Sequence, residues 1–211
     1  MSSFARIDYG QWPRREYYEF FGRTTIYMTV QLDIRPLWDR VKERGEKLYP
    51  ALLYGAARVI NSDENFRYDL DAQGHVGRWD RMDPYYTVLR SDGSGLFSMV
   101  CTPYTETYAE FYDAYLRDAA AAGGCGKLIC GALAPNGFGV TAVPGTHHTS
   151  FCFAGDPKQD LKPFLLYGKV EREGDRVLLP VTGEFAHGVH DGTHVSQFFD
   201  RLKEELNHLE R

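Results

Sequence analysis

The C-terminal part of the chain places a long strand pair directly before an amphipathic helix. Residues 164–185, FLLYGKVEREGDRVLLPVTGEF, predict two strands that turn at Gly174-Asp175. Residues 194–209 predict a helix, because apolar side chains recur there at helical intervals: Val195, Phe198, Phe199, Leu202 and Leu206. Between these elements lie Asp191, Gly192 and Thr193, which suit a turn and a helix N-cap. A strand that leads into a helix in this way indicates an α/β fold.

Helical and strand patterns follow one another through the rest of the chain. Helices are predicted from Trp12-Pro13 to Phe21 and over residues 35–45, 49–61 and 105–122. Strands are predicted over 24–34, 139–145 and 150–155, with hairpins that turn at Gln73-Gly74 and Asp92-Gly93. These elements predict a mixed β-sheet covered by helices. No internal repeat, low-complexity tract or Pro/Ser-rich linker divides the sequence, so we expect one domain over residues 1–211.

Composition excludes several classes of protein. Hydrophobic residues make up 43% of the chain, but no apolar run approaches the roughly 18 residues needed to cross a bilayer, so we expect a soluble protein. The N-terminus has no secretion signal, and the four cysteines form no CxxC pair, so we expect a cytoplasmic protein with free thiols. A formal net charge of -5 gives no electrostatic footprint for nucleic acid.

Histidines gather around the predicted turn, and they support two chemical interpretations. His187, His190, Asp191 and His194 have the i, i+3, i+4 and i+7 spacing of one helical face, which suggests a metal-dependent hydrolase. The turn at Asp191-Gly192-Thr193 breaks that face, however, so we expect the side chains not to converge and no metal to bind. The other interpretation makes one histidine a base and leaves His190 and His194 as hydrogen-bonded or partly exposed residues without a chemical role.

The sequence resembles the chloramphenicol acetyltransferase family in several ordered segments. His187-x-x-x-Asp191-Gly192 matches that family's motif, which other CoA-dependent acyltransferases share, including the catalytic domains of 2-oxo acid dehydrogenase complexes. The similarity extends over nearly the whole chain through five segments: WPRREYYEFF at 12–21, WDRMDPYYTV at 79–88, FSMVCTPY at 97–104, EGDRVLLPV at 173–181 and HDGTHVSQFFDRL at 190–202. The resemblance implies a two-layer α/β sandwich, a homotrimer with the active site between two subunits, and direct transfer of an acetyl group from acetyl-CoA to a hydroxyl of chloramphenicol.

The resemblance makes His187 the general base. An alcohol attacks a thioester only when a base removes its proton, and the ordinary pKa of histidine suits this task near neutral pH. The resulting tetrahedral oxyanion needs a hydrogen-bond donor. The family uses a serine hydroxyl there, and Thr141 is the matching residue here; the alternative is an ordinary strand threonine.

Three further residues receive roles from the resemblance. Asp191 is expected to pair with an N-terminal arginine, either Arg14 or Arg15, and so to support the active-site turn without itself reacting. Lys169 matches a lysine near the cofactor end of the site and is expected to meet the phosphates of CoA.

Departures from the family concern mainly the acceptor. Ala186, His190 and Thr193 replace the usual histidine, cysteine and phenylalanine of the motif. The loop at Gly22–Ile26 is shorter than its counterpart, and Leu166 stands where a threonine supports the transition state through water. We predict an aromatic acceptor pocket of Phe20, Phe21, Tyr27, Phe97 and Phe151.

The acceptor remains open at this stage. The base is expected from one subunit, and Phe20, Phe21 and Phe97 largely from its neighbour. A different hydroxyl or amine acceptor on the same fold is the alternative, and each aromatic residue taken singly also fits a place in the core. Retention of His187 argues against a noncatalytic binding protein.

Overall fold

The computed structural model of the chain describes residues 2–154 and 160–210. Its helices are α1 (Arg15–Phe21), α2 (Arg35–Arg44), α3 (Leu48–Ser62), α4 (Tyr108–Gly124) and α5 (Gly192–His208), with a short 3-10 helix η1 (Glu64–Arg67). Its strands are β1 (Phe4–Arg6), β2 (Thr25–Asp33), β3 (Tyr68–Leu70), β4 (Val76–Trp79), β5 (Asp83–Leu89), β6 (Phe97–Cys101), β7 (Gly137–Ala142), β8 (Phe164–Tyr167), β9 (Glu171–Glu173) and β10 (Arg176–Ala186).

The described strands form one seven-stranded and one three-stranded sheet. The large sheet has the order β2-β10-β8-β7-β5-β6, with β9 on β10, and the small sheet has the order β1-β4-β3. Strand β7 is parallel to β5 and β8, whereas the other pairs in the large sheet are antiparallel. The mixed sheet predicted from the sequence is therefore present.

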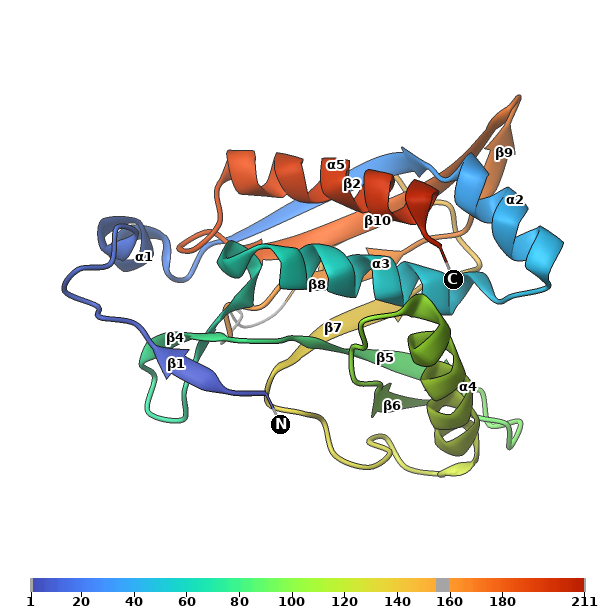
Figure 1. Cartoon of the computed structure of the whole chain (residues 1–211), viewed down its shortest axis with the longest axis horizontal. Helices are drawn as coiled ribbons and strands as arrows, with labels where there is room; N and C mark the ends of the chain where they lie inside the picture. Colours follow the sequence, from blue (N-terminus) through green and yellow to red (C-terminus); the bar gives the residue numbers. More distant parts are fainter. Residues whose placement is uncertain (1, 155–159, 211) are drawn as a thin grey trace.

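Helices α2, α3, α4 and α5 cover one face of the large sheet, whereas α1 lies at one end of the molecule (Figure 1). The main core lies between these four helices and the sheet. Successive residues of a strand point to opposite faces. On the covered face, Val140, Leu165 and Val181 are almost fully buried, and the Tyr167 hydroxyl donates to the Leu52 carbonyl of α3 at 3.1 Å. The opposite face carries Thr141, Leu166 and Thr182, which lie side by side on β7, β8 and β10. This second face is where the candidate site residues of those strands lie.

Most predicted elements are confirmed, and two differ in instructive ways. Gly45, with a φ of 64°, ends α2 as expected, and Gly174 marks the turn between β9 and β10. Helix α4 begins at Tyr108, three residues later than predicted, because the Thr107 side chain caps it by accepting from the Glu110 amide.

The strand predicted over 150–155 is wrong for its described part. Residues 150–154 form no strand, and Gly155 lies outside the described residues. The alternating aromatic pattern has another cause: Phe151 contacts Phe153, and Phe153 contacts Phe164 of β8, with ring centroids 5.0 and 5.4 Å apart. This segment packs on the uncovered face of the sheet through side chains, while the Tyr27 hydroxyl bonds the Phe153 carbonyl at 3.1 Å.

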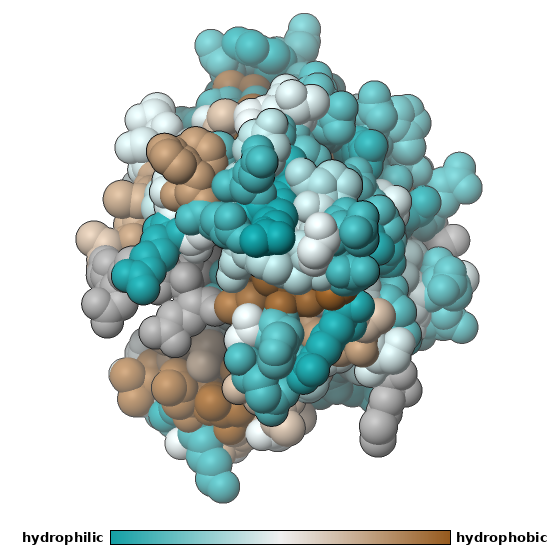
Figure 2. Space-filling model, turned by 90° about the vertical axis from the view of Figure 1, so that its left-hand side faces the viewer, coloured by the Kyte–Doolittle hydropathy of each residue, from teal (hydrophilic) through white to brown (hydrophobic). Residues whose placement is uncertain are grey.

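The face at the end of the molecule that carries α1 is largely hydrophilic, with hydrophobic side chains gathered in a few patches (Figure 2). Phe20 of α1 is 80% exposed, far more than an aromatic side chain of a core. Among residues 2–154 and 160–210, no helix has the length and apolar character required to span a membrane.

Candidate active site

His187 follows the last residue of β10, where the sheet holds its backbone in place. Ala186 pairs with Thr25 of β2, and the His187 amide donates to the Thr24 carbonyl at 2.8 Å. The His187 ring nitrogen Nδ1 lies 2.9 Å from the His190 carbonyl, which can only accept, so Nδ1 carries the hydrogen. In the neutral ring, Nε2 then has the free lone pair. This is the tautomer that a general base acting through Nε2 requires.

Phe21 stacks on the imidazole of His187 within the same chain. The two ring centroids lie 4.1 Å apart at an interplanar angle of 24°. Phe20 contacts Phe21 edge to face, with centroids 4.7 Å apart. The expectation that Phe21 reaches the base from a neighbouring subunit is therefore wrong, because the short connection from α1 to β2 keeps Phe21 beside the base of its own chain. Phe20 is exposed, and its contact with a neighbouring subunit stays a prediction.

Asp191 caps α5 and binds Arg14, which resolves the choice between the two arginines. Its carboxylate accepts from the Thr193 and His194 amides and from His194 Nδ1, the last at 2.8 Å. Arg14 Nη1 lies 3.2 Å from the second carboxylate oxygen, and Arg14 Nε is 3.4 Å from the Gly188 carbonyl. Arg15 instead pairs with Glu19 on the helix surface at 2.8 Å. Arg14 thus links α1 to the turn that carries His187.

The contacts of Asp191 favour its charged form. Partial burial raises the pKa of this carboxyl group, but the hydrogen bonds from His194 and Arg14 outweigh burial and lower the pKa to about 2. A carboxyl group has an ordinary pKa of about 3.9 in an unfolded chain. Because the folded value is lower, the contribution of Asp191 to stability is complete above about pH 4 and disappears as the pH falls through 2.

Replacing Asp191 by asparagine is expected to destabilise the protein and lower its activity together. Asparagine remains a good N-cap, so the loss is confined to the charge-assisted bonds with Arg14 and His194. We expect about 1 kcal/mol at pH 7, which is roughly 2–4 °C in Tm for a chain of this size. Thermal unfolding followed from pH 7 to pH 2 should show the difference between wild type and variant shrinking below about pH 4.

The two neighbouring arginines provide a matched control for this effect. Arg14→Gln should reproduce the loss caused by Asp191→Asn. Arg15→Gln removes an exposed pair with Glu19 and a cation–π contact with Tyr9 on the surface, and it should change the unfolding free energy by less than about 0.5 kcal/mol. An unchanged melting temperature with a selective loss of rate in Asp191→Asn would contradict the supporting role and favour direct participation in the reaction.

The remaining histidines of the cluster each have a different partner. His194 bonds Asp191, and its ring centroid lies 6.4 Å from that of His190. His190 is fully buried, with Nε2 facing the Asn65 carbonyl at 3.0 Å. Within the described part of the chain, no group of three metal-ligating side chains is arranged to hold an ion. His187, His190 and His194 therefore hydrogen-bond to different groups: the His190 carbonyl, the Asn65 carbonyl and the Asp191 carboxylate.

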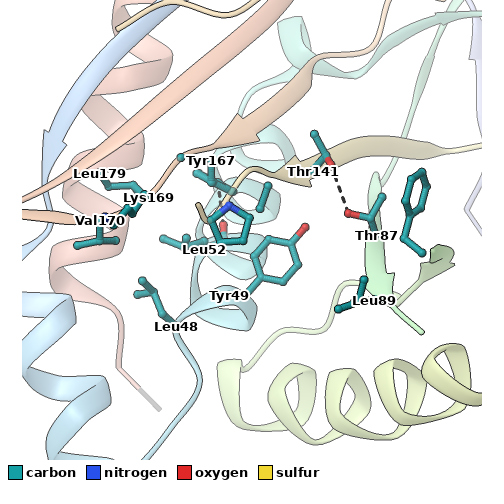
Figure 3. Close-up of a pocket in the computed structure, with 14 residues that line it drawn as sticks. Leu48, Tyr49, Leu52, Thr87, Leu89, Thr141, Tyr167, Lys169, Val170 and Leu179 are labelled. Carbon is teal, nitrogen blue, oxygen red and sulfur yellow. Dashed lines mark hydrogen bonds between the residues drawn. The ribbon is translucent and has the colours of Figure 1, made fainter. Parts of the chain in front are cut away.

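Thr141, Phe97 and Lys169 line one cavity of about 620 Å³, with α3 and the ends of β5, β7 and β8 around it (Figure 3). Its walls are mostly apolar and include Leu48, Leu52, Leu89, Val170 and Leu179. Thr141 and Lys169 lie on opposite sides of this cavity, with Tyr49 between them (Figure 3). The cavity therefore brings together residues that the sequence suggested separately for oxyanion, acceptor and cofactor contacts.

The Thr141 hydroxyl has a neighbour that the sequence analysis missed. Thr87 Oγ1 on β5 lies 3.3 Å from Thr141 Oγ1 on β7, and either oxygen is able to donate (Figure 3). The Tyr49 hydroxyl adjoins Thr87, and burial raises the pKa of this phenol, which keeps it neutral. Strand alternation could have identified Thr87 from the sequence. Thr87 stands between the buried Tyr86 and the half-buried Val88, so its side chain points to the opposite face from theirs, which is the face of Thr141.

Tyr27 and Phe151 occupy a different place on the uncovered face. Together with Leu166, Phe153 and Phe164 they enclose a cavity of only about 10 Å³, with Thr182 and Glu184 also lining it. Leu166, which replaces the expected threonine, lies between Thr141 and Thr182 in the strand register. The predicted acceptor residues thus fall into three groups within one chain: Phe20 with Phe21, Tyr27 with Phe151, and Phe97.

One chain keeps His187 and Thr141 far apart. Thr182 is aligned with Leu166, which is aligned with Thr141, so two strand spacings of about 4.8 Å separate Thr182 from Thr141. His187 lies five residues further along the chain from Thr182, roughly 16 Å at the rise of a strand. The two Cα atoms are therefore roughly 19 Å apart, too far for both side chains to contact one reacting carbonyl.

Known proteins with the same organisation are chloramphenicol acetyltransferases. A family model described as chloramphenicol acetyltransferase matches residues 2–203. The chain is 38% identical over 209 residues to the enzyme of Campylobacter coli, covering 97% of this chain and 99% of the relative. It is 34% identical over 207 residues to that of Staphylococcus aureus, with 96% and 95% covered.

Solved structures share the fold at lower sequence identity. A chloramphenicol acetyltransferase superposes with a TM-score of 0.82 at 22% identity, covering 97% of this chain and 100% of that chain. A truncated catalytic core of the 2-oxoacid dehydrogenase complex from Thermoplasma acidophilum gives a TM-score of 0.69 at 12% identity, with 93% and 94% covered. From the family match and the close relatives, the chain belongs to the chloramphenicol acetyltransferase family of acyltransferases.

Proposed function

We propose that the protein transfers the acetyl group of acetyl-CoA to a hydroxyl of chloramphenicol, with His187 as general base. The observation that carries this proposal is the hydrogen bond from His187 Nδ1 to the His190 carbonyl, which leaves Nε2 free to accept a proton. Relatives over 30% identical along almost the whole chain bear the name of this activity. We place the reaction in the cytoplasm.

The reaction needs one proton to move twice. Nε2 of His187 takes the proton of the acceptor hydroxyl as its oxygen attacks the thioester carbonyl, forming a C–O bond and a tetrahedral oxyanion. The hydroxyl of Thr141 donates to that oxyanion. Its hydrogen is then used, so in this arrangement the Thr87 hydroxyl is the donor of the 3.3 Å bond to Thr141. When the oxyanion collapses, the C–S bond breaks and the imidazolium returns the proton to the CoA thiolate.

The 620 Å³ cavity suits the elongated arm of acetyl-CoA. Its apolar walls fit a flexible aliphatic chain, and the Thr141 hydroxyl lies at one side. Lys169 lies at the other side with an exposed side chain, where its ammonium group is available to a phosphate as a point charge.

A complete site then requires a second copy of the chain. Because His187 and Thr141 are roughly 19 Å apart in one chain, the base of one subunit must meet the cavity of the next. Such a contact joins two different surfaces of the chain, one with the base and one with the cavity. When the rotation that relates neighbouring subunits closes after three copies, the ring has three equivalent sites. We therefore propose a homotrimer in which one subunit supplies His187 with Phe21, and the next subunit supplies the cavity that Phe97 lines.

A different acceptor on the same fold is the second candidate function. Leu166 offers no hydroxyl to an acceptor. The cavity beside Tyr27 and Phe151, at about 10 Å³, is too small to hold an acceptor molecule. These features favour an acceptor whose shape differs from that bound by family members with a threonine at the position of Leu166.

The decisive experiment for the acceptor is release of the CoA thiol from acetyl-CoA, measured with a panel of small alcohols and amines that includes chloramphenicol. We expect thiol release and a product heavier by one acetyl group with chloramphenicol. Rapid release with another alcohol or an amine and none with chloramphenicol would support the second candidate. No release with any acceptor would contradict both.

A further inference from the structure

His190 connects the active-site turn to a distant segment of the chain. Its side chain is 0% exposed and stacks on Phe66 of η1, with ring centroids 5.3 Å apart at an angle of 15°. Phe185 of β10 meets the same ring edge to face, with centroids 5.6 Å apart. A polar ring buried among aromatic side chains must form hydrogen bonds to offset the loss of water.

The contacts of the His190 ring identify the nitrogen that donates. Nε2 lies 3.0 Å from the Asn65 carbonyl, and Nδ1 lies 3.2 Å from the Ala186 carbonyl. The Ala186 carbonyl already accepts the backbone amides of Val189 and His190, which occupy its two lone pairs. A neutral imidazole has a single N–H, so Nε2–H donates to Asn65. The ring therefore ties the turn to η1.

The backbone of the same residue holds the base. The His190 carbonyl accepts the hydrogen from His187 Nδ1 at 2.9 Å, so one residue anchors the turn with its ring and orients His187 with its carbonyl. Hydrogen bonds weaken steeply when distance or angle changes, and a carbonyl on a loosened turn would no longer select one tautomer of His187.

We propose that His190 is a positioning residue for His187: its ring fixes the turn against Asn65, and the carbonyl so fixed keeps His187 hydrogenated on Nδ1 with Nε2 free. The catalytic consequence rests on the proposed function, in which Nε2 of His187 is the base. The orientation of His187 is independent of that function.

Two variants separate the hydrogen bond from the bulk of the ring. His190→Gln places an amide donor near the position of Nε2, whereas His190→Leu fills a similar volume without a donor. We expect His190→Leu to lower kcat about 10- to 100-fold, the range found when a partner that orients a metal-bound histidine is lost, and to change the KM for acetyl-CoA less than about twofold. His190→Gln should restore most of kcat. His75→Gln, on an exposed hairpin, is the control for replacing a histidine.

Nitrogen-15 NMR of the imidazole rings tests the orientation without measuring activity. In the wild-type protein we expect the hydrogen of His187 on Nδ1 and that of His190 on Nε2, and in His190→Leu a mixture of both forms of His187. If His190→Leu does not fold, the wild-type spectrum still shows which nitrogen of His187 carries the hydrogen. The rate of His190→Gln then shows whether a donor near the position of Nε2 is enough for activity. A wild-type His187 with its hydrogen on Nε2 overturns the proposal, as does a folded His190→Leu protein with unchanged kcat and an unchanged spectrum. Activity retained in His187→Ala would overturn the proposed function and leave the NMR result to test the orientation.

Discussion

His187→Ala is expected to abolish acetyl transfer while the protein remains folded. A positioned general base contributes about 10²- to 10⁴-fold to such a reaction, and alanine leaves no nitrogen at this position to accept the proton. The half-buried ring has one hydrogen bond through Nδ1 and one aromatic stack, so its loss should cost about 1–2 kcal/mol of unfolding free energy. Thiol release gives the rate, and thermal unfolding gives the stability.

His208→Ala is the matched control, because this histidine is exposed near the end of α5 and bonds only a backbone carbonyl of its own helix. Its activity should equal that of the wild type. Activity of His187→Ala within tenfold of wild type would show that His187 is not the base.

Thr141→Val is expected to lower kcat about 10²- to 10³-fold, because it removes the hydroxyl while keeping the branched shape of the side chain. Loss of one positioned donor to an oxyanion typically costs about 2.7–4 kcal/mol of transition-state stabilisation. The Thr87 hydroxyl lies 3.3 Å from that of Thr141, and when Thr87 donates, the hydrogen of Thr141 is free to point at the oxyanion. Steady-state kinetics should place the loss in kcat, with the KM for acetyl-CoA nearly unchanged.

Thr141→Ser keeps the hydroxyl and should retain activity within about tenfold of the wild type. If Thr141→Val turns over at the wild-type rate, Thr141 is an ordinary strand residue, and the oxyanion donor lies elsewhere.

The sequence predicted elements whose limits are set by local chemistry. The glycine at the end of α2 has a φ of 64°, and Asp191 caps α5 with its carboxylate, so both limits could be recognised from residue type alone. The segment 150–155 misled the analysis because alternating aromatic residues satisfy either a strand ladder or packing on the face of another strand. Only the positions of distant residues, such as Phe164, distinguish these two outcomes.

The candidate site was predictable to a similar extent. The resemblance to the family assigned roles to His187, Asp191 and Thr141, and the structure confirms the pairing of Asp191 with an N-terminal arginine. The catalytic roles of His187 and Thr141 stay predictions. The side of the cleft on which Phe21 lies could not be predicted, since it depends on how tightly the turn after α1 returns the chain to β2. Tyr49 and Thr87 were missed for a related reason, because they lie on α3 and β5 in patterns typical of core residues. The sheet register brings Thr87 to the Thr141 hydroxyl, and Tyr49 in turn bonds Thr87.

A mixture of the two inactive variants tests the shared site most directly. In a cyclic trimer, each site takes His187 from one chain and Thr141 from its neighbour. If equal amounts of His187→Ala and Thr141→Val chains are unfolded, mixed and reassembled at random, about one site in four receives both intact residues, since each is present with a probability of about one half. We predict recovery of about a quarter of wild-type activity in the mixture and almost none in either variant treated alone. A mixture that forms mixed trimers, shown by mass spectrometry, yet remains as inactive as its components would contradict a site shared between two chains.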